Sequence, residues 1–259
     1  MLSATNISFH IGKKTILQNV SVDFLPGEFA MILGPNGSGK STFLKIFSGE
    51  INRFQGTVSY NNKNIGSIKK EELAKYRAVM SQQPELSFPL TVEEVVMMGR
   101  YPHFVFNPGK KDLEICEEAM AILNLSDFKT RNYTTLSGGE KQRVQYARVL
   151  AQVWEAPANG IRYLFLDEPL NNLDVKYQQD FLKTAASFKK HNTVLLAVMH
   201  DINLAVQYAD KLIFLKEGKL IASGQPSAIL NEALIKEVFD VSSQIIKAPG
   251  EQTQLVVFS

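Results

Sequence analysis

Residues 29–47 read FAMILGPNGSGKSTFLKIF, and this stretch decides the fold. A short apolar run leads into a glycine-rich loop, which leads into a segment with the apolar spacing of a helix. Gly34, Gly37 and Gly39 allow backbone conformations that a Cβ would forbid, so successive N–H groups can converge on one anion. The pattern G-x-x-x-x-G-K-[ST] between a strand and a helix therefore predicts a phosphate-binding loop at residues 34–41.

The polar residues of this loop complete a site for a nucleotide. Lys40 would reach the β- and γ-phosphates, the Ser41 hydroxyl would bind Mg²⁺, and the helix N-terminus would add its positive dipole end. A solvated Gly/Ser turn is the alternative, which the flanking strand and helix disfavour. The residues expected to contact the cofactor here are Gly34, Pro35, Asn36, Gly37, Ser38, Gly39, Lys40, Ser41 and Thr42.

Composition sets broad limits on the class of protein. The chain has 259 residues, 45% hydrophobic and 21% charged, as expected for one large or two small folded domains. Lys plus Arg number 28 and Asp plus Glu 26, so we expect no nucleic-acid partner. The single cysteine, Cys116, excludes an intrachain disulfide and should be a buried apolar group on a helix. The sequence has no signal-peptide pattern and no apolar run of about 18 residues, which predicts a cytoplasmic protein.

Hydrophobic spacing divides the chain into three kinds of region. Residues 2–30 and 56–60 predict short strands and hairpins, which indicate an antiparallel β subdomain. Residues 87–155 carry long helical patterns and predict a helical subdomain. Beyond them, near-continuous apolar strands alternate with helices, which indicates a parallel sheet that the strand of the phosphate loop should join. We predict a single domain with its core at 1–86 and 156–241 and a tail at 242–259.

Two carboxylates follow a buried strand at residues 163–168, YLFLDE. They would lie at the carboxyl end of a parallel strand, where ligands bind in α/β sheets. Asp167 suits the Mg²⁺ shell, and Glu168 suits a general base that polarises the attacking water. An ordinary acidic strand end before Pro169 is the alternative, and the phosphate loop favours the functional interpretation.

A second glycine-rich element, LSGGE at residues 136–140, precedes another helix. Ser137 and the N–H groups of Gly138 and Gly139 could bind a further phosphate, yet one nucleotide does not need two such loops from one chain. Two copies packed head to tail would resolve this, each closing the other's site across a twofold interface. Ser137 and Glu140 also predict a capping box, which is compatible with that role.

These three motifs, in this order and spacing, resemble the ATP-binding subunits of ABC transporters over essentially the whole chain. The resemblance implies an α/β fold with a P-loop NTPase (RecA-like) parallel-sheet core, an N-terminal antiparallel β subdomain and an inserted helical subdomain. It also implies the cofactors ATP and Mg²⁺, ATP hydrolysis by a homodimer, two integral membrane permease subunits as partners and, indirectly, a periplasmic substrate-binding protein. Such a subunit is peripheral on the inner face of the cell membrane.

Further site residues are carried over from the resemblance. Gln82 matches the family's Q-loop glutamine, a ligand of Mg²⁺ that also contacts the attacking water, although Gln83 is adjacent. His200 follows a predicted strand and matches the switch histidine, which would bond the γ-phosphate and orient the water of Glu168.

Two positions depart from the family pattern. Asp174 matches the D-loop aspartate and should contact the cofactor across the dimer, but Asn171-Asn172 replaces the commoner small residues before it. Ile11 stands where an aromatic residue usually stacks on adenine, so an apolar contact from Ile11, or Phe9 on the same strand face, would take its place.

The run at residues 88–103 resembles importers of iron chelates, vitamin B12 and haem. The long segment at 153–162 looks like the haem (hemin) importer group, so we expect haem to be the transported substrate. A ferric siderophore or vitamin B12 importer is the alternative. A non-transport ABC ATPase is disfavoured because no second nucleotide domain, coiled-coil insertion or basic patch is present, and a nucleotide sensor is disfavoured by Glu168 and His200. Met97, Met98 and His103 are expected to be core or permease-facing rather than haem ligands.

Overall fold

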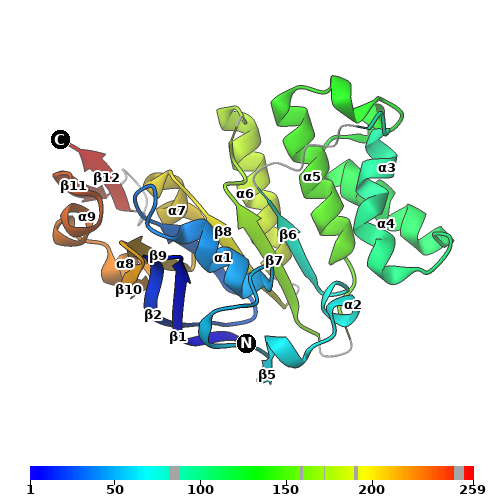
Figure 1. Cartoon of the computed structure of the whole chain (residues 1–259). Coiled ribbons are helices and arrows are strands. Elements are labelled where there is room, and N and C mark those ends of the chain that lie inside the picture. Colours follow the sequence, from blue (N-terminus) through cyan, green and yellow to red (C-terminus); the bar gives the residue numbers. More distant parts are fainter. Residues whose placement is uncertain (82–87, 158–159, 172, 190–191, 248–253) are drawn as a thin grey trace. The chain divides into compact units, whose positions relative to one another are not determined.

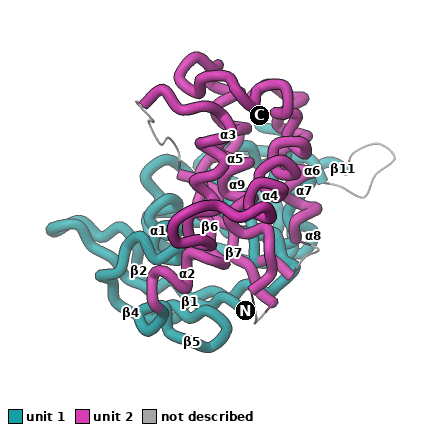
Figure 2. Tube along the Cα trace, turned by 90° about the vertical axis from the view of Figure 1, so that its right-hand side faces the viewer, with its two compact units in different colours: residues 1–68, 194–259 teal, residues 69–193 magenta. Residues whose placement is uncertain are grey.

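The computed structural model describes residues 1–81, 88–157, 160–171, 173–189, 192–247 and 254–259. The chain divides into two compact units, residues 1–68 with 194–259, and residues 69–193 (Figure 2). Elements carry the labels of Figure 1. The predicted division into a core, a helical subdomain and a tail is based on secondary structure, and it stays a prediction.

The first unit contains the predicted antiparallel sheet, with strand order β2-β1-β4-β5. Its strands are β1 (Leu2–Ile11), β2 (Lys14–Phe24), β4 (Gln55–Tyr60) and β5 (Lys63–Asn64). Asn61 and Asn62 join β4 to β5 with φ of 47° and 66°. Two left-handed residues in a two-residue connection are favoured in hairpins, and asparagine adopts this conformation more readily than most residues.

The first unit also contains parallel strands around the strand that leads into the phosphate loop. These are β3 (Phe29–Leu33), β8 (Thr193–Val198) and β9 (Lys211–Lys216), with β10 (Lys219–Gly224) antiparallel on β9. β3 lies between β8 and β9 and is parallel to both. Every residue of β3 and β8 is buried, which explains why these strands are continuously apolar. The predicted parallel sheet around β3 is confirmed.

Short helices and a C-terminal hairpin complete the first unit (Figure 1). The helices are α1 (Lys40–Ser48), η1 (Ile65–Ser67), α7 (Ile202–Tyr208), α8 (Pro226–Ile229) and α9 (Glu232–Phe239). In the tail, β11 (Ser243–Lys247) and β12 (Gln254–Phe258) pair antiparallel. The amide of Asn203 on α7 donates to the Val256 carbonyl at 3.1 Å and accepts from its N–H at 2.8 Å. The tail is therefore anchored to α7.

The second unit is mostly helical. It contains the parallel strands β6 (Arg77–Met80) and β7 (Arg162–Asp167). Its helices are α2 (Lys70–Leu73), α3 (Val92–Met97), η2 (Met98–His103), α4 (Lys110–Ile122), η3 (Ser126–Phe128), η4 (Tyr133–Thr135), α5 (Gly138–Gln152) and α6 (Val175–Lys189). Helix α5 packs against α3, α4 and η2. Cys116 is buried on α4, as predicted, and burial raises its thiol pKa to about 12.

A buried arginine organises the helical part of this unit. Arg100 is 1% exposed and donates to Asp112 Oδ1 at 2.9 Å and to Glu155 Oε2 at 2.5 Å. Pairing of this kind is what makes burial of a guanidinium tolerable. Arg162 Nη1 donates to the Val153 carbonyl at 3.0 Å. Both ends of the long segment between α5 and β7 are therefore anchored within the unit.

Candidate nucleotide-binding and hydrolysis site

The phosphate loop connects buried β3 to α1 and takes its shape from glycine. Gly34, Gly37 and Gly39 have φ of 150°, 78° and 100°, which side chains rarely tolerate. A Cβ on Gly34 would lie 2.0 Å from the Leu215 carbonyl oxygen, whereas a Cβ on Gly37 would meet nothing within 4 Å. The loop is thus tightly packed on the side of Gly34 and has open space beside Gly37.

Lys40 supplies the cation of this loop. It is 6% exposed, and its Nζ donates to the carbonyls of Gly34 at 2.8 Å and Pro35 at 3.0 Å. The buried hydroxyl of Ser38 has no hydrogen-bond partner within the part of the chain that the structure describes. The buried Ser38 hydroxyl could donate to a bound phosphate, and the buried Lys40 ammonium and the glycine N–H groups supply positive charge and donors beside it.

His200 lies near the phosphate loop in the first unit. The N–H of Met199, the residue before it, donates to the Ile32 carbonyl at 3.0 Å, two residues before Gly34. His200 itself is exposed, and Asp201 after it caps α7 by accepting from the Leu204 N–H at 2.9 Å. The adjacent carboxyl ends of β3 and β8 therefore bring His200 and the phosphate loop to one edge of the sheet.

The two residues expected near adenine lie on β1. Phe9 is half-buried, whereas the side chain of Ile11 is 62% exposed. Ile11 is therefore accessible for an apolar contact at the surface. The contact of either residue with adenine stays a prediction.

In the second unit, the candidate base has a strained backbone. Asp167 ends β7 and is 4% exposed, and Glu168 follows it with φ of 49°. A left-handed conformation costs a glutamate about 1–2 kcal/mol, and such residues cluster at functional sites. The Asn171 N–H donates to the Glu168 carbonyl at 3.4 Å, and the Asn171 side-chain Nδ2 donates to Glu168 Oε2 at 2.8 Å. This second contact was not anticipated, although the departure of Asn171 from the family pattern was a signal.

The predicted capping box at the start of α5 is confirmed. The Ser137 N–H donates to Glu140 Oε2 at 2.7 Å, and the Glu140 N–H donates to Ser137 Oγ at 3.3 Å. The N–H and hydroxyl of Ser137 lower the pKa of Glu140. Ser137 and Gly138 are exposed, so this loop is accessible to a partner molecule. Gln142, one turn further, donates from Nε2 to the Pro169 carbonyl at 2.8 Å, a link that the sequence did not reveal.

The remaining predicted residues have different outcomes. Asp174 Oδ1 accepts from the Tyr177 N–H at 3.0 Å and so caps α6, while its role toward the cofactor stays a prediction. Gln82 and its neighbour Gln83 lie outside the described residues.

The donor set proposed for Mg²⁺ is made of oxygens only. In the described ranges, no three His, Cys, Asp or Glu side chains cluster as a metal site. The Ser41 hydroxyl and the Asp167 carboxylate are each a type of ligand that Mg²⁺ accepts, since this ion usually binds one or two protein oxygens together with phosphates and water. In the same ranges, no helix is long and apolar enough to span a bilayer.

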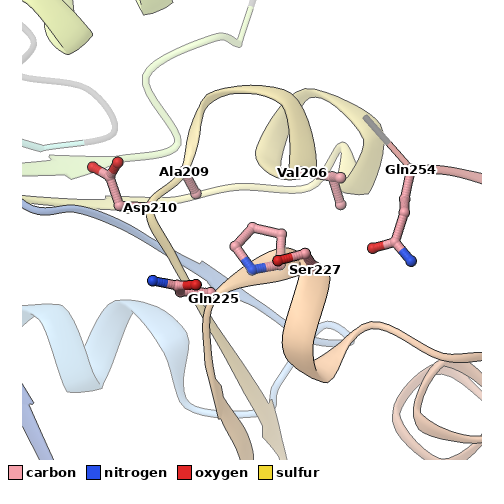
Figure 3. Close-up of a pocket in the computed structure, with 7 residues that line it drawn as sticks. Val206, Ala209, Asp210, Gln225, Ser227 and Gln254 are labelled. Atoms are coloured by element: carbon pink, nitrogen blue, oxygen red, sulfur yellow. The ribbon is translucent and has the colours of Figure 1, made fainter. Parts of the chain in front are cut away.

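A pocket of about 370 Å³ opens elsewhere in the first unit. Figure 3 shows side chains of α7 and the residues after it on one side and those at the start of α8 on the other. Its lining residues are Val206, Ala209, Asp210, Gln225, Pro226, Ser227 and Gln254. None of the predicted site residues is among them, so this pocket is not the nucleotide site.

Comparisons with known proteins identify the family. A sequence profile described as ABC transporter matches residues 17–171. The chain belongs to the ABC transporter family. This membership makes it an ABC-type ATPase with the P-loop cassette fold, as its motifs predicted.

Individual relatives of this ABC transporter chain match most or all of its length. It is 43% identical to the hemin import ATP-binding protein HmuV of Gloeobacter violaceus, over 99% of this chain and 94% of that protein. It is 42% identical to HmuV of Mesorhizobium japonicum, over 99% and 98%. Among solved structures, a metal-chelate type ABC transporter in an inward-facing conformation matches 100% of this chain and 96% of that protein's chain, with 25% identity and a TM-score of 0.82. The dimeric bacterial ABC transporter cassette MJ0796 matches 87% and 99%, with 27% identity and a TM-score of 0.75.

Proposed function

We propose that the chain is the ATP-binding and ATP-hydrolysing subunit of an ABC importer that takes up haem. The observation that carries the ATPase role is the combination of a glycine-built phosphate loop, a buried Asp167 followed by left-handed Glu168, and an exposed, capped Ser137 loop. The substrate is supported by relatives named as hemin import ATP-binding proteins, which match 99% of this chain.

The reaction is phosphoryl transfer from ATP to water. Lys40 and the loop N–H groups stabilise the phosphates, and Glu168 accepts a proton from the attacking water. His200 and Gln82 position that water. Mg²⁺, when held by Ser41, Asp167 and Gln82, neutralises phosphate charge.

Hydrolysis takes place in a head-to-tail homodimer. Ser137, Gly138 and Gly139 of one chain bind the nucleotide held by Lys40 of the other, and Asp174 contacts it near the interface. Phe9 or Ile11 contacts adenine. The proposal is supported by the exposure of the Ser137 loop and by the dimeric structure of the MJ0796 cassette.

The dimer acts on the inner face of the cell membrane. Its closing and opening is transmitted to two integral membrane permease subunits, which receive haem from a periplasmic substrate-binding protein. The subunit itself does not ligate haem. In support, His103 Nε2 hydrogen-bonds the Gln152 carbonyl at 2.8 Å and Met97 Sδ lies 4.0 Å from Cys116 Sγ.

Glu168→Gln tests the catalytic assignment. Removing the base should lower ATP turnover by about 100-fold or more while ATP binding persists, because the phosphate loop is intact. Phosphate release, nucleotide titration and light scattering would measure turnover, affinity and an ATP-trapped dimer. Lys40→Ala is the matched variant, which should lose ATP binding instead. Turnover of Glu168→Gln close to that of the wild type would remove Glu168 from the base role.

Reconstitution tests the substrate. The subunit and its permease would be placed in proteoliposomes with the binding protein, and ATPase activity would be measured with haem, a ferric siderophore or vitamin B12. We expect stimulation by haem alone. Stimulation by a siderophore or by vitamin B12 instead would overturn the haem assignment and leave the ATPase assignment intact.

A further inference from the structure

The turn that follows Glu168 is fixed by hydrogen bonds from its own residues. The Asn171 N–H donates to the Glu168 carbonyl at 3.4 Å, and the Leu173 N–H donates to the Leu170 carbonyl at 3.2 Å. Within this turn, the Asn171 side chain reaches back, and its Nδ2 donates to Glu168 Oε2 at 2.8 Å. An amide can donate only through this nitrogen, so one carboxylate oxygen of Glu168 is held by a directional, charge-assisted bond.

The same turn is attached to α5, the helix that begins at the Ser137 loop. Gln142 lies on α5, two residues after Glu140 of the capping box, and its Nε2 donates to the Pro169 carbonyl at 2.8 Å. Pro169 is the residue directly after Glu168. One bond therefore joins the first turns of α5 to the peptide beside the candidate base.

We propose that Asn171 is a positioning residue for Glu168, and that Gln142 links the position of this turn to the Ser137 loop. The inference rests on the proposed role of Glu168 as base. Glu168 has a left-handed backbone, and the Asn171 amide holds its carboxylate through a hydrogen bond. Since a small misplacement of a catalytic group can cost about 100-fold in rate, a defined carboxylate position matters for turnover.

The link has a consequence for the dimer. In the head-to-tail arrangement, the Ser137 loop of one chain contacts the partner's nucleotide, whereas Glu168 acts on the nucleotide of its own chain. The bond from Gln142 to the Pro169 carbonyl thus connects the two sites through a single chain. Nucleotide engaged at the Ser137 loop would set the position of the base at the other site.

Substitutions at Asn171 test the positioning role. Asn171→Ala removes the donor, and Asn171→Asp keeps the shape and the turn preference but places a second carboxylate beside Glu168. Both should lower kcat about 10- to 100-fold and change the Kd for ATP less than about twofold. The matched control is Gln178→Ala, because Gln178 Nε2 donates to the Leu173 carbonyl at 3.1 Å and the variant so removes a different side-chain bond to the same turn. If Asn171→Asp kept full kcat, the turn alone would be the function of Asn171 and the proposal would fail.

A readout without nucleotide separates this proposal from the proposed function. In chains labelled with ¹³C at glutamate carboxyl groups, the Glu168 signal is assigned by its disappearance in Glu168→Gln. That signal should move in Asn171→Ala and Asn171→Asp and stay in Gln178→Ala. An unmoved signal overturns the positioning role. If the signal moves but Glu168→Gln retains turnover, the contact between Asn171 and Glu168 exists but Glu168 is not the base. The positioning role for hydrolysis then fails together with the base role.

A double-mutant cycle tests the link to α5. Gln142→Ala should lower kcat by about 3- to 10-fold, and the double variant with Asn171→Ala should be no slower than Asn171→Ala alone, because both changes release the same turn. Full additivity of the two effects would show that Gln142 and Asn171 act separately, and the proposed link would be wrong.

Discussion

The phosphate loop and the turn after β7 both need left-handed backbone, but they obtain it differently. In the phosphate loop all such residues are glycines, with φ of 150°, 78° and 100° at Gly34, Gly37 and Gly39. In the turn, the left-handed residue is Glu168 itself, with φ of 49°. The first region has to present backbone N–H groups, for which side chains are an obstacle, whereas the second has to present a carboxylate and cannot use glycine.

The difference extends to what holds each region in place. The phosphate loop packs so closely on β9 that Gly34 has no room for a Cβ. The turn after β7 is held by side-chain amides, from Asn171 to the Glu168 carboxylate and from Gln142 to the Pro169 carbonyl. A substitution in the loop should therefore act through sterics and stability, and a substitution in the turn through the position of one carboxylate.

Of the substitutions that test this comparison, Gly34→Ala should cause the largest loss of stability. The new Cβ would lie 2.0 Å from the Leu215 carbonyl oxygen, so β9 or the loop must move. We expect a loss of at least about 3 kcal/mol in the free energy of unfolding, together with loss of ATP binding. Urea unfolding and nucleotide titration would measure both.

Gly37→Ala is the matched control for that variant. Its φ of 78° is also left-handed, but a Cβ there meets nothing within 4 Å. The cost should be about 1–2 kcal/mol, from the backbone conformation alone. Equal losses for the two variants would mean that close packing against Leu215 does not distinguish the two glycines.

Ser137→Ala should have a smaller effect on stability, about 1 kcal/mol, because it removes the side-chain half of a capping box. Thr91 provides a matched box on α3, with Thr91 N–H to Glu94 Oε2 at 2.7 Å and Glu94 N–H to Thr91 Oγ1 at 3.3 Å, the same distances as at Ser137. Thr91→Ala should cost the same stability. Only Ser137→Ala should reduce ATP turnover, and equal turnover in both would limit Ser137 to capping.

The contribution of the capping box to stability also depends on pH, and the pKa of Glu140 determines the direction of this dependence. The Ser137 N–H and hydroxyl lower the pKa of Glu140 below its ordinary value of 4.5. The box therefore adds stability above pH 4.5, and this contribution is lost as the pH falls through the folded-state pKa. Ser137→Ala removes the hydroxyl but keeps the N–H, so it should reduce this contribution without abolishing it, as acid unfolding curves would show.

The sequence predicted the phosphate loop, the buried strand before Asp167 and the capping box because each depends on local chemistry. The glycine spacing, the apolar runs and the Ser137–Glu140 pair each determine the structure of residues only a few positions away in the sequence. The contact from Gln142 to Pro169 spans 27 residues and depends on how α5 packs, so no local pattern contains it. The bond from Asn171 to Glu168 is local, but it depends on the left-handed backbone at Glu168. This conformation could not be predicted, because glutamate has no preference for it.

Glu168→Asn should have the smallest effect on stability and isolates the strain at the base. Asparagine adopts the left-handed conformation more readily than glutamate, which favours the variant, while the bond from Asn171 to the carboxylate is lost. These effects oppose each other, so the free energy of unfolding should stay within about 1 kcal/mol of the wild type while turnover is abolished.

Glu217→Asn is the control without a catalytic role. Glu217 is exposed, has φ of 50° and precedes Gly218 with φ of 75° in the turn between β9 and β10. Asn-Gly is the preferred pair for such a turn, so the variant should gain about 0.5–1 kcal/mol with unchanged turnover. Thermal unfolding of both variants would then compare the same backbone strain with and without a catalytic side chain. A gain at Glu217 and none at Glu168 would indicate that the bond from Asn171 offsets the strain at the base, whereas a full gain at Glu168 would mean that this bond contributes nothing to the stability of the turn.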